Sequence, residues 1–199
     1  MFYEPRHRDT DKLPRSPINA IVAPRPIGWI SSVSSQGDIN LAPYSFFNVF
    51  CSNPPIVGFS SIGVKDTLSF IRDTMEFTYS MATADLIDQV HITSSQSPRG
   101  ASEFTLAGLT TAPSRLVSAP RVAESPAALE CRVTQVTRLI DAAAQECDAY
   151  LVLGEVIGVH IDDRLLENGR FVTGKAAPLS RCGYNDYATI LSYVSRTPA

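Results

Sequence analysis

The chain has 199 residues, of which 44% are hydrophobic and 19% charged, and its formal net charge is −3 at pH 7. This balance suits a globular protein with one sizeable core, and it lacks the basic surplus of a nucleic-acid-binding protein. No apolar run reaches the roughly 18 residues that a membrane span needs, and the polar first residues do not form a signal peptide. We therefore expect a cytoplasmic protein with no nucleic-acid or membrane partner.

The cysteines and histidines do not form metal-binding patterns. The four cysteines include no CxxC pair, and His7, His91 and His160 lie far apart in the chain. Neither an HExxH motif nor another metal-ligand spacing occurs. We expect free thiols, no bound metal and no disulfide framework.

The first half of the chain predicts an extended arm followed by antiparallel strands. Residues 1–16 contain two prolines and alternating charges, which favours an extended N-terminal arm, and the domain proper is expected over residues 17–199. Residues 27–34 are rich in β-formers and end at a turn, 35–38. We interpret Asn40 as a turn residue, with strand-like segments on both sides of Asn53-Pro54-Pro55. Consecutive strands with short turns indicate antiparallel neighbours.

The second half adds a few short helices and two long strands. Asp66 or Thr67 is a candidate N-cap for a helix over 68–73. Gly154 and Gly158 predict bends or bulges in the last long strand. The other expected elements are strands at 76–81, 129–140 and 150–161, short helices at 86–90 and 104–109, a polar loop at 93–103, an extended stretch at 110–128, and a short strand or helix after 181–187. The economical solution is a mainly β fold in which an antiparallel barrel closes its own edges.

Familiar nucleotide and hydrolase motifs are absent. Residues 169–175 have the glycine and lysine spacing of a phosphate loop, but Ala176 stands where the Mg²⁺-binding hydroxyl is required and Pro178 interrupts the following helix. No GxGxxG lies between a strand and a helix, and no GxSxG elbow is present. We find no candidate catalytic side chain.

Two clusters have a physical case for ligand binding. Lys65-Asp66-Thr67 stands at an expected helix start, where free N–H groups and the helix dipole favour an anion such as phosphate. Ser31-Ser32 and the segment 45–48 could present hydroxyls and backbone groups to a polar ring edge. From the residues alone, a solvated lysine, strand serines and core phenylalanines explain these clusters better. His160, in an apolar strand, is explained better as a hydrogen-bonded core histidine than as a catalytic one.

Several uncommon short motifs follow one another in a fixed order along the chain. Residues 23–34 read APRPIGWISSVS and residues 40–48 read NLAPYSFFN, and Asn53-Pro54-Pro55 and Lys65-Asp66-Thr67 follow. Weaker matches continue at 129–131, 154–156 and 181–187. Through these motifs the chain resembles the flavin reductase-like family of FMN-binding split barrels over about residues 17–190.

The resemblance implies a six-stranded antiparallel split β-barrel that forms a homodimer with FMN, or FAD, at the subunit interface. It places Ser31 and Ser32 along the flavin and the 45–48 segment beside its ring, largely through backbone groups. His160 and Arg181 match positions that face the flavin or the partner subunit. The implied cofactor-binding residues are Ser31, Ser32, Ser45, Phe46, Phe47, Asn48, Ser60, Ser61, Lys65, Asp66 and Thr67.

The implied activity is that of an NAD(P)H:flavin reductase, in which hydride passes from NAD(P)H to the flavin and the protein supplies orientation and water exclusion. The physiological acceptor would then be a monooxygenase partner in a two-component system. Two alternatives stay open. One is an FMN-binding carrier or redox-sensing protein without reductase turnover, and the other is an enzyme that uses the flavin to oxidise a small substrate directly.

Overall fold

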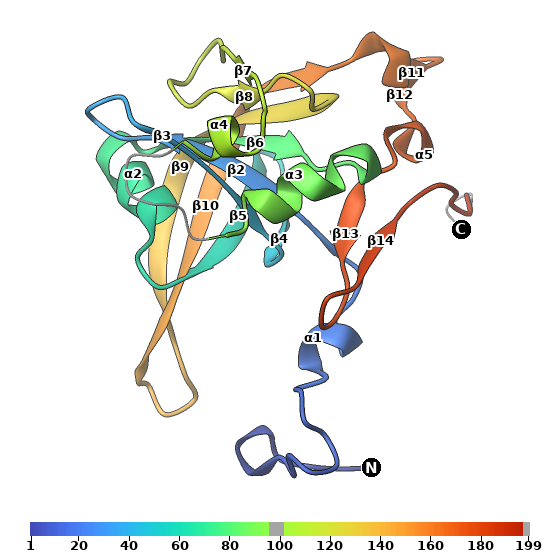
Figure 1. Cartoon of the computed structure of the whole chain (residues 1–199). Helices are drawn as coiled ribbons and strands as arrows, with labels where there is room; N and C mark the ends of the chain where they lie inside the picture. Colours follow the sequence, from blue (N-terminus) through green and yellow to red (C-terminus); the bar gives the residue numbers. More distant parts are fainter. Residues whose placement is uncertain (96–101, 197–199) are drawn as a thin grey trace.

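A computed structural model describes residues 1–95 and 102–196 of the chain, and Figure 1 shows its elements. The predicted mainly β class is confirmed, because long antiparallel strands form the body and short helices cover it. The strands are β1 (Arg25–Pro26), β2 (Gly28–Val33), β3 (Ile39–Tyr44), β4 (Phe47–Ser52), β5 (Pro55–Ile62), β6 (Glu76–Met81), β7 (Thr111–Ala112), β8 (Arg121–Val122), β9 (Ala127–Ile140), β10 (Glu146–Ile161), β11 (Leu166–Glu167), β12 (Arg170–Phe171), β13 (Leu179–Arg181) and β14 (Tyr187–Thr189). The helices are α1 (Ile18–Ile21), α2 (Asp66–Thr74), α3 (Ile87–Ile92), α4 (Glu103–Leu106) and α5 (Thr173–Ala176), with 3-10 turns at Pro5–His7, Ala84–Leu86 and Asp163–Leu165.

The main sheet follows the order β3-β2-β6-β9-β10-β5-β4, and every neighbouring pair in it is antiparallel. The two ends of its six-strand part approach each other, because the Tyr44 ring of β3 packs on the Phe59 ring of β5 with centroids 4.5 Å apart. β4 pairs with the outer edge of β5 and adds a seventh strand to the predicted six. The sheet is therefore a split barrel whose β3 and β5 sides meet through side chains.

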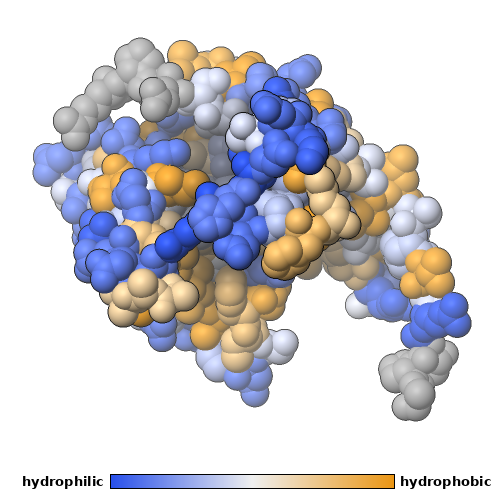
Figure 2. Space-filling model, turned by 90° about the horizontal axis from the view of Figure 1, so that it is seen from below, coloured by the Kyte–Doolittle hydropathy of each residue, from blue (hydrophilic) through white to orange (hydrophobic). Residues whose placement is uncertain are grey.

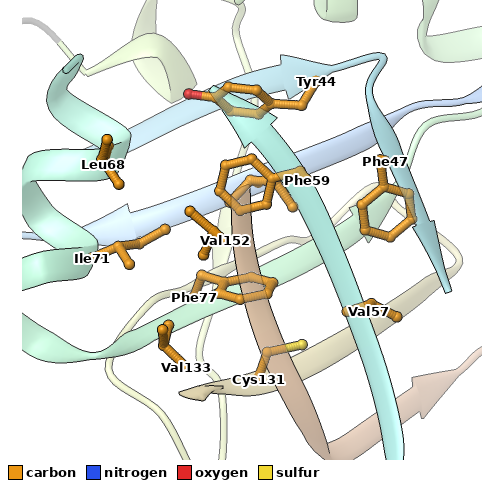
Figure 3. Close-up of a cluster of buried hydrophobic side chains, with 11 residues drawn as sticks. Tyr44, Phe47, Val57, Phe59, Leu68, Ile71, Phe77, Cys131, Val133 and Val152 are labelled. Atoms are coloured by element: carbon orange, nitrogen blue, oxygen red, sulfur yellow. The ribbon is translucent and has the colours of Figure 1, made fainter. Parts of the chain in front are cut away.

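Alternation along the strands creates two cores. Phe59, Phe77 and Val152 point into the barrel, and α2 closes one end with Leu68 and Ile71 (Figure 3). A second cluster, on the other face of β2 and β3, gathers Trp29, Leu41, Val90 of α3 and Phe104 of α4, among others. Every residue of β2 is consequently buried, although the strand belongs to two different cores.

The long strands β9 and β10 are irregular where glycine was expected to bend them. The register shifts between Leu153 and Gly154 and again between Val156 and Gly158, which confirms both predicted irregularities. A Cβ atom on Gly154 would lie only 2.5 Å from Cε1 of Phe77, so the close approach to the core requires glycine there. β10 begins at Glu146, before the predicted Tyr150, because a tight turn joins it directly to β9.

Two local predictions are wrong. Asn40 lies inside β3 and not in a turn, opposite Ser32 of β2. Helix α2 has Lys65 as its N-cap, and neither Asp66 nor Thr67 caps it. Thr67 points instead toward the barrel, where its Oγ1 accepts a hydrogen bond from Asn40 Nδ2 at 2.7 Å. Within the predicted loop 93–103, residues 96–101 lie outside the described residues.

Residues 1–17 run from α1 away from the barrel (Figure 1). Arg6 in this arm forms an ion pair of 3.3 Å with Asp141, at the tip of the β9–β10 hairpin. Arg25, which follows α1, donates to the carbonyls of Asn19, Val22 and Cys182, and so ties α1 to the β13–β14 hairpin. The boundary at residue 16 between arm and domain stays a prediction. None of the helices in the described part of the chain is long and apolar enough to cross a membrane.

Candidate functional site

Two cavities of about 390 and 310 Å³ adjoin along β3, and they share Pro43 and Ser94. They lie between β3, the N-terminus of α2, and the segment that comprises α3 and the residues that follow it. The larger cavity has Ile27, Pro43, Ser45, Val90, His91, Ser94, Arg181, Asn185 and Tyr187 as its lining. The smaller has Asn40, Ala42, Pro43, Tyr44, Lys65, Asp66, Thr67, Thr93, Ser94, Ser95 and Glu103. The two adjoining cavities, together called the elongated cavity below, differ in chemistry at their far ends.

The end at α2 is suited to an anion. Lys65 is the exposed N-cap residue of this nine-residue helix, and no described side chain caps the helix there. The first-turn N–H groups therefore stay available, and the positive end of the helix dipole points at the cavity. Thr67 adds a hydroxyl that Asn40 holds by its hydrogen bond. The donor set of a lysine, a hydroxyl and a helix N-terminus matches a phosphate group.

An unsatisfied hydroxyl lies at the same end. Tyr44 is only 8% exposed, and its Oη has no hydrogen-bond partner among the described residues. Burial raises the pKa of this phenol, and the neighbouring hydroxyls of Thr67 and Ser61 offset the rise only in part. The hydroxyl therefore stays protonated and can act as a donor. A buried donor without a partner is costly, so this hydroxyl marks the α2 end of the cavity as a polar site.

The opposite end combines aromatic, cationic and hydroxyl groups. Arg181 lies over the Tyr187 ring, with its Cζ 4.4 Å from the ring centroid, and donates to the Tyr184 carbonyl. Ser45 and the exposed His91 line the cavity beside them. This end offers a flat apolar surface and several hydrogen-bonding groups, which suits a polar ring system.

Four predicted cofactor residues line the cavities, namely Ser45, Lys65, Asp66 and Thr67. The rest of the predicted ring-binding segment lies around the start of β4. Phe46 and Asn48 are exposed, whereas the Phe47 ring is buried in the barrel and stacks on Tyr79 with centroids 4.9 Å apart. On β5, Ser60 is half-buried, and Ser61 is buried with its Oγ donating to Gly63 O at 3.1 Å.

Ser31 and Ser32 do not line these cavities, and both are fully buried in β2. The Ser31 hydroxyl donates to the Pro120 carbonyl, because the segment that joins β7 and β8 crosses the outside of the barrel at this point. Thr78 of β6 holds the same segment by donating to Ala119 O at 2.8 Å. The Ser32 hydroxyl is buried without a partner among the described residues. The structure thus gives Ser31 a role in holding the 110–126 segment.

His160 belongs to a separate cavity of about 810 Å³. Its Nε2 shares a hydrogen bond with the fully buried Glu130, which also accepts from the N–H groups of Arg115 at 2.8 Å and Leu116 at 2.6 Å. Burial acts to raise the pKa of Glu130, but these hydrogen bonds outweigh it and the pKa is lowered. The expected hydrogen bond of His160 is confirmed, but the residue is half-buried at a cavity and is not part of either core cluster.

Several cavity residues were not predicted from the sequence, including Asn40, Tyr44, His91 and Tyr187. Alternation along β3 is the one signal that groups Asn40, Ala42 and Tyr44 on a single face, and it required the strand to begin before Asn40. His91 and Tyr187 come from distant segments and carry no local signal. Within residues 1–95 and 102–196, no cluster of His, Cys, Asp or Glu could hold a metal ion.

Comparison with known proteins places the chain among flavin proteins. The profile of the flavin reductase like domain matches residues 22–180. An uncharacterised protein of Aquifex aeolicus is 33% identical over 173 residues, which cover 84% of this chain and 85% of that protein. An uncharacterised protein of Halalkalibacterium halodurans is 35% identical, with 83% and 81% covered.

Solved structures agree with this assignment. Nitrilotriacetate monooxygenase component B from Bacillus cereus superimposes with a TM-score of 0.88 at 26% identity, and 98% of each chain is covered. The 2-nitrobenzoate 2-nitroreductase of Pseudomonas fluorescens shares the fold with a TM-score of 0.85 at 24% identity, covering 100% of this chain and 96% of that one. The chain therefore belongs to the flavin reductase-like family.

Proposed function

We propose that the protein binds FMN in the elongated cavity along β3 and acts as an NAD(P)H:flavin reductase. The observation that carries the proposal is that two adjoining cavities, which share Pro43 and Ser94, reach the uncapped helix N-terminus at one end and Arg181 and Tyr187 at the other. FMN has the same two ends, a phosphate and a flat ring. The family match over residues 22–180 supports a flavin rather than another ligand of that shape.

The α2 end would hold the phosphate through the donors at the start of α2, while the Glu103 carboxylate that also lines this cavity accepts from the Leu41 N–H at 3.1 Å. Lys65 supplies a positive charge, and Thr67 supplies a hydroxyl whose oxygen already accepts from Asn40. Asp66 can contribute its N–H group, since its carboxylate would repel a phosphate. Ser60 and Ser61 lie on β5, next to this end in sequence, but the Ser61 hydroxyl is already engaged with Gly63. We assign the phosphate to Lys65, Thr67 and the first-turn N–H groups.

The ring end would orient the isoalloxazine. Ser45 can present hydroxyl and backbone groups to its polar edge, while Tyr187 and Pro43 offer apolar surface to its face. Bound flavin would supply the redox chemistry, by accepting a hydride from NADH or NADPH and passing electrons to an acceptor. The chain itself then has to orient both partners and exclude water, and no acid or base side chain is assigned to the step.

A second copy of the chain is the expected partner. β4 is an edge strand, and Val49 and Phe50 on it are 61% and 52% exposed. Figure 2 shows further apolar surface between hydrophilic groups on the face seen from below. Unpaired strand edges and apolar patches of this kind are typical of interfaces. We propose a homodimer that completes the flavin site, and size-exclusion chromatography with light scattering should report twice the 21.6 kDa chain mass.

The likeness to a monooxygenase component B supports an oxygenase as electron acceptor. The decisive experiment is an absorption spectrum of the purified protein, followed by NADH and NADPH oxidation with added FMN, FAD or riboflavin. We expect flavin bands and flavin-dependent oxidation. A protein that stays colourless with excess FMN would refute the proposal. Bound FMN without oxidation of either nucleotide would identify a carrier or redox sensor, and bleaching by a metabolite alone would identify direct substrate oxidation.

A further inference from the structure

Three polar side chains form a row at the N-terminus of α2. Asn40 Nδ2 donates to Thr67 Oγ1 at 2.7 Å, and Tyr44 Oη neighbours Thr67 on the barrel side. Figure 3 shows the Tyr44 hydroxyl pointing toward the end of α2 that carries Leu68. Asn40 and Tyr44 lie on the same face of β3, four residues apart, so one rigid strand positions both.

The arrangement restricts what Thr67 can do with its single proton. A threonine hydroxyl has one O–H donor and two acceptor lone pairs. One lone pair of Thr67 is occupied by the Asn40 amide, and the raised pKa of Tyr44 keeps the phenol protonated as a second potential donor to the same oxygen. When Tyr44 donates to Thr67, the threonine proton is left to point away from both, toward the cavity that the three residues line.

We propose that Tyr44 is a positioning residue for phosphate recognition, acting by donating to Thr67 so that the Thr67 hydroxyl donates to a phosphate group at the N-terminus of α2. The Tyr44 hydroxyl makes no hydrogen bond with another described residue, so its proton is available for Thr67. The inference rests on the proposed function, since it takes the phosphate to be that of FMN. It adds a residue that no local motif around Lys65-Asp66-Thr67 contains.

The test compares Tyr44→Phe, Thr67→Val and the double variant, each titrated with FMN and with riboflavin, which lacks the phosphate. Both substitutions preserve shape, so the barrel should stay folded. Tyr79→Phe is the matched control, because Tyr79 also points into the barrel but packs near Phe47, away from α2. Flavin fluorescence quenching gives the dissociation constants, and thermal unfolding of each variant verifies its fold.

Tyr44→Phe should raise the Kd of FMN about fivefold and that of riboflavin by less than about twofold. The substitution removes one hydrogen bond, and this bond affects binding only through the phosphate group. In the Thr67→Val background, Tyr44→Phe should have almost no further effect, because the group it acts through is gone. Tyr79→Phe should leave both affinities unchanged. Additive losses in the double variant, equal losses for the two flavins, or no loss at all would overturn the inference.

A second measurement separates this inference from the proposed function. Thermal unfolding in inorganic phosphate, against chloride at equal ionic strength, reports on the anion site without any flavin. If the wild type binds no flavin but phosphate raises its Tm, and Tyr44→Phe reduces that shift, the function is wrong and the positioning role stands. If the wild type responds to neither flavin nor phosphate, both are wrong.

Discussion

Replacing Lys65 with alanine tests whether the N-terminus of α2 is the phosphate end of the site. Lys65 is exposed, so its charge acts through water-like surroundings. At about 4 Å, two unit charges attract by roughly 1 kcal/mol in water, and a phosphate monoester carries a charge of about −1.5 to −2 at neutral pH. The loss is therefore about 1.5–2 kcal/mol, which corresponds to a Kd for FMN raised by roughly tenfold to thirtyfold.

Riboflavin and salt provide the internal controls for this variant. Riboflavin lacks the phosphate, so its Kd should change by less than about twofold. The effect on FMN should also shrink to a few-fold at about 1 M salt, where the screening length falls to roughly 3 Å. Lys12→Ala is a matched substitution, because Lys12 lies in the N-terminal arm and pairs with Asp9 at 3.4 Å.

Fluorescence titrations with both flavins at low and high salt would measure these constants. Equal losses for FMN and riboflavin would show that Lys65 supports the pocket in another way. A loss for FMN that salt does not reduce would also refute the electrostatic reasoning. A loss of the same size in Lys12→Ala would show that the effect does not depend on where the charge lies.

Three other predictions test the scaffold. Gly154→Ala should destabilise the fold by about 1–3 kcal/mol in urea unfolding, because its Cβ would meet Phe77 at 2.5 Å. Gly158→Ala should cost less, because the nearest contact of its Cβ is at 3.3 Å. Equal losses of stability in the two variants would contradict this reasoning. Glu130→Gln should cost about 1–3 kcal/mol at neutral pH. The pKa of Glu130 is lower in the folded than in the unfolded state, so its contribution to the free energy of unfolding is present above the unfolded-state pKa and is lost as pH falls through the folded-state pKa. Unfolding measured across pH should show this loss at acid pH in the wild type and not in the variant. Ser31→Ala should lower the free energy of unfolding by about 1–2 kcal/mol, because the hydrogen bond to the Pro120 carbonyl is lost, and should leave the FMN affinity unchanged. Weaker FMN binding at unchanged stability would instead place Ser31 in the FMN site.

The strands could be predicted where turn residues and alternation agree. β2, β6 and the last parts of β9 and β10 follow from β-forming runs between turn signals, and Gly154 and Gly158 indicated the irregular register. The start of β3 could not be predicted in this way. Asn40 has the composition of a turn, yet it is held in the strand by its pairing with Ser32 and by its bond to Thr67. Those partners are tertiary, and no local pattern contains them.

Some residues that line the cavities could be predicted from sequence motifs, but the direction in which each side chain points could not. The resemblance identified Lys65, Asp66, Thr67 and Ser45, which do line the cavities. It could not tell which face of β2 each serine occupies, and the partner of Ser31 comes from 89 residues further along the chain. Likewise, His91 and Tyr187 come from segments far along the chain from β3, and only the folded chain brings them to the cavity that Pro43 and Ser45 also line.

The position of β3 explains why one strand determines so much of the site. It borders the split of the barrel, where no backbone pairing joins it to β5 and only side chains such as Tyr44 and Phe59 meet. A strand within a closed ladder would give all its hydrogen bonds to neighbouring strands, whereas among the described strands β3 pairs with β2 only, and the Leu41 N–H donates to the Glu103 carboxylate of α4 at 3.1 Å. Asn40 and Tyr44 project from the barrel face of β3 toward Thr67, and Pro43 and Ser45 line the larger cavity. The split that prevents full closure of the barrel therefore lies beside the cavities in which we propose that the flavin binds.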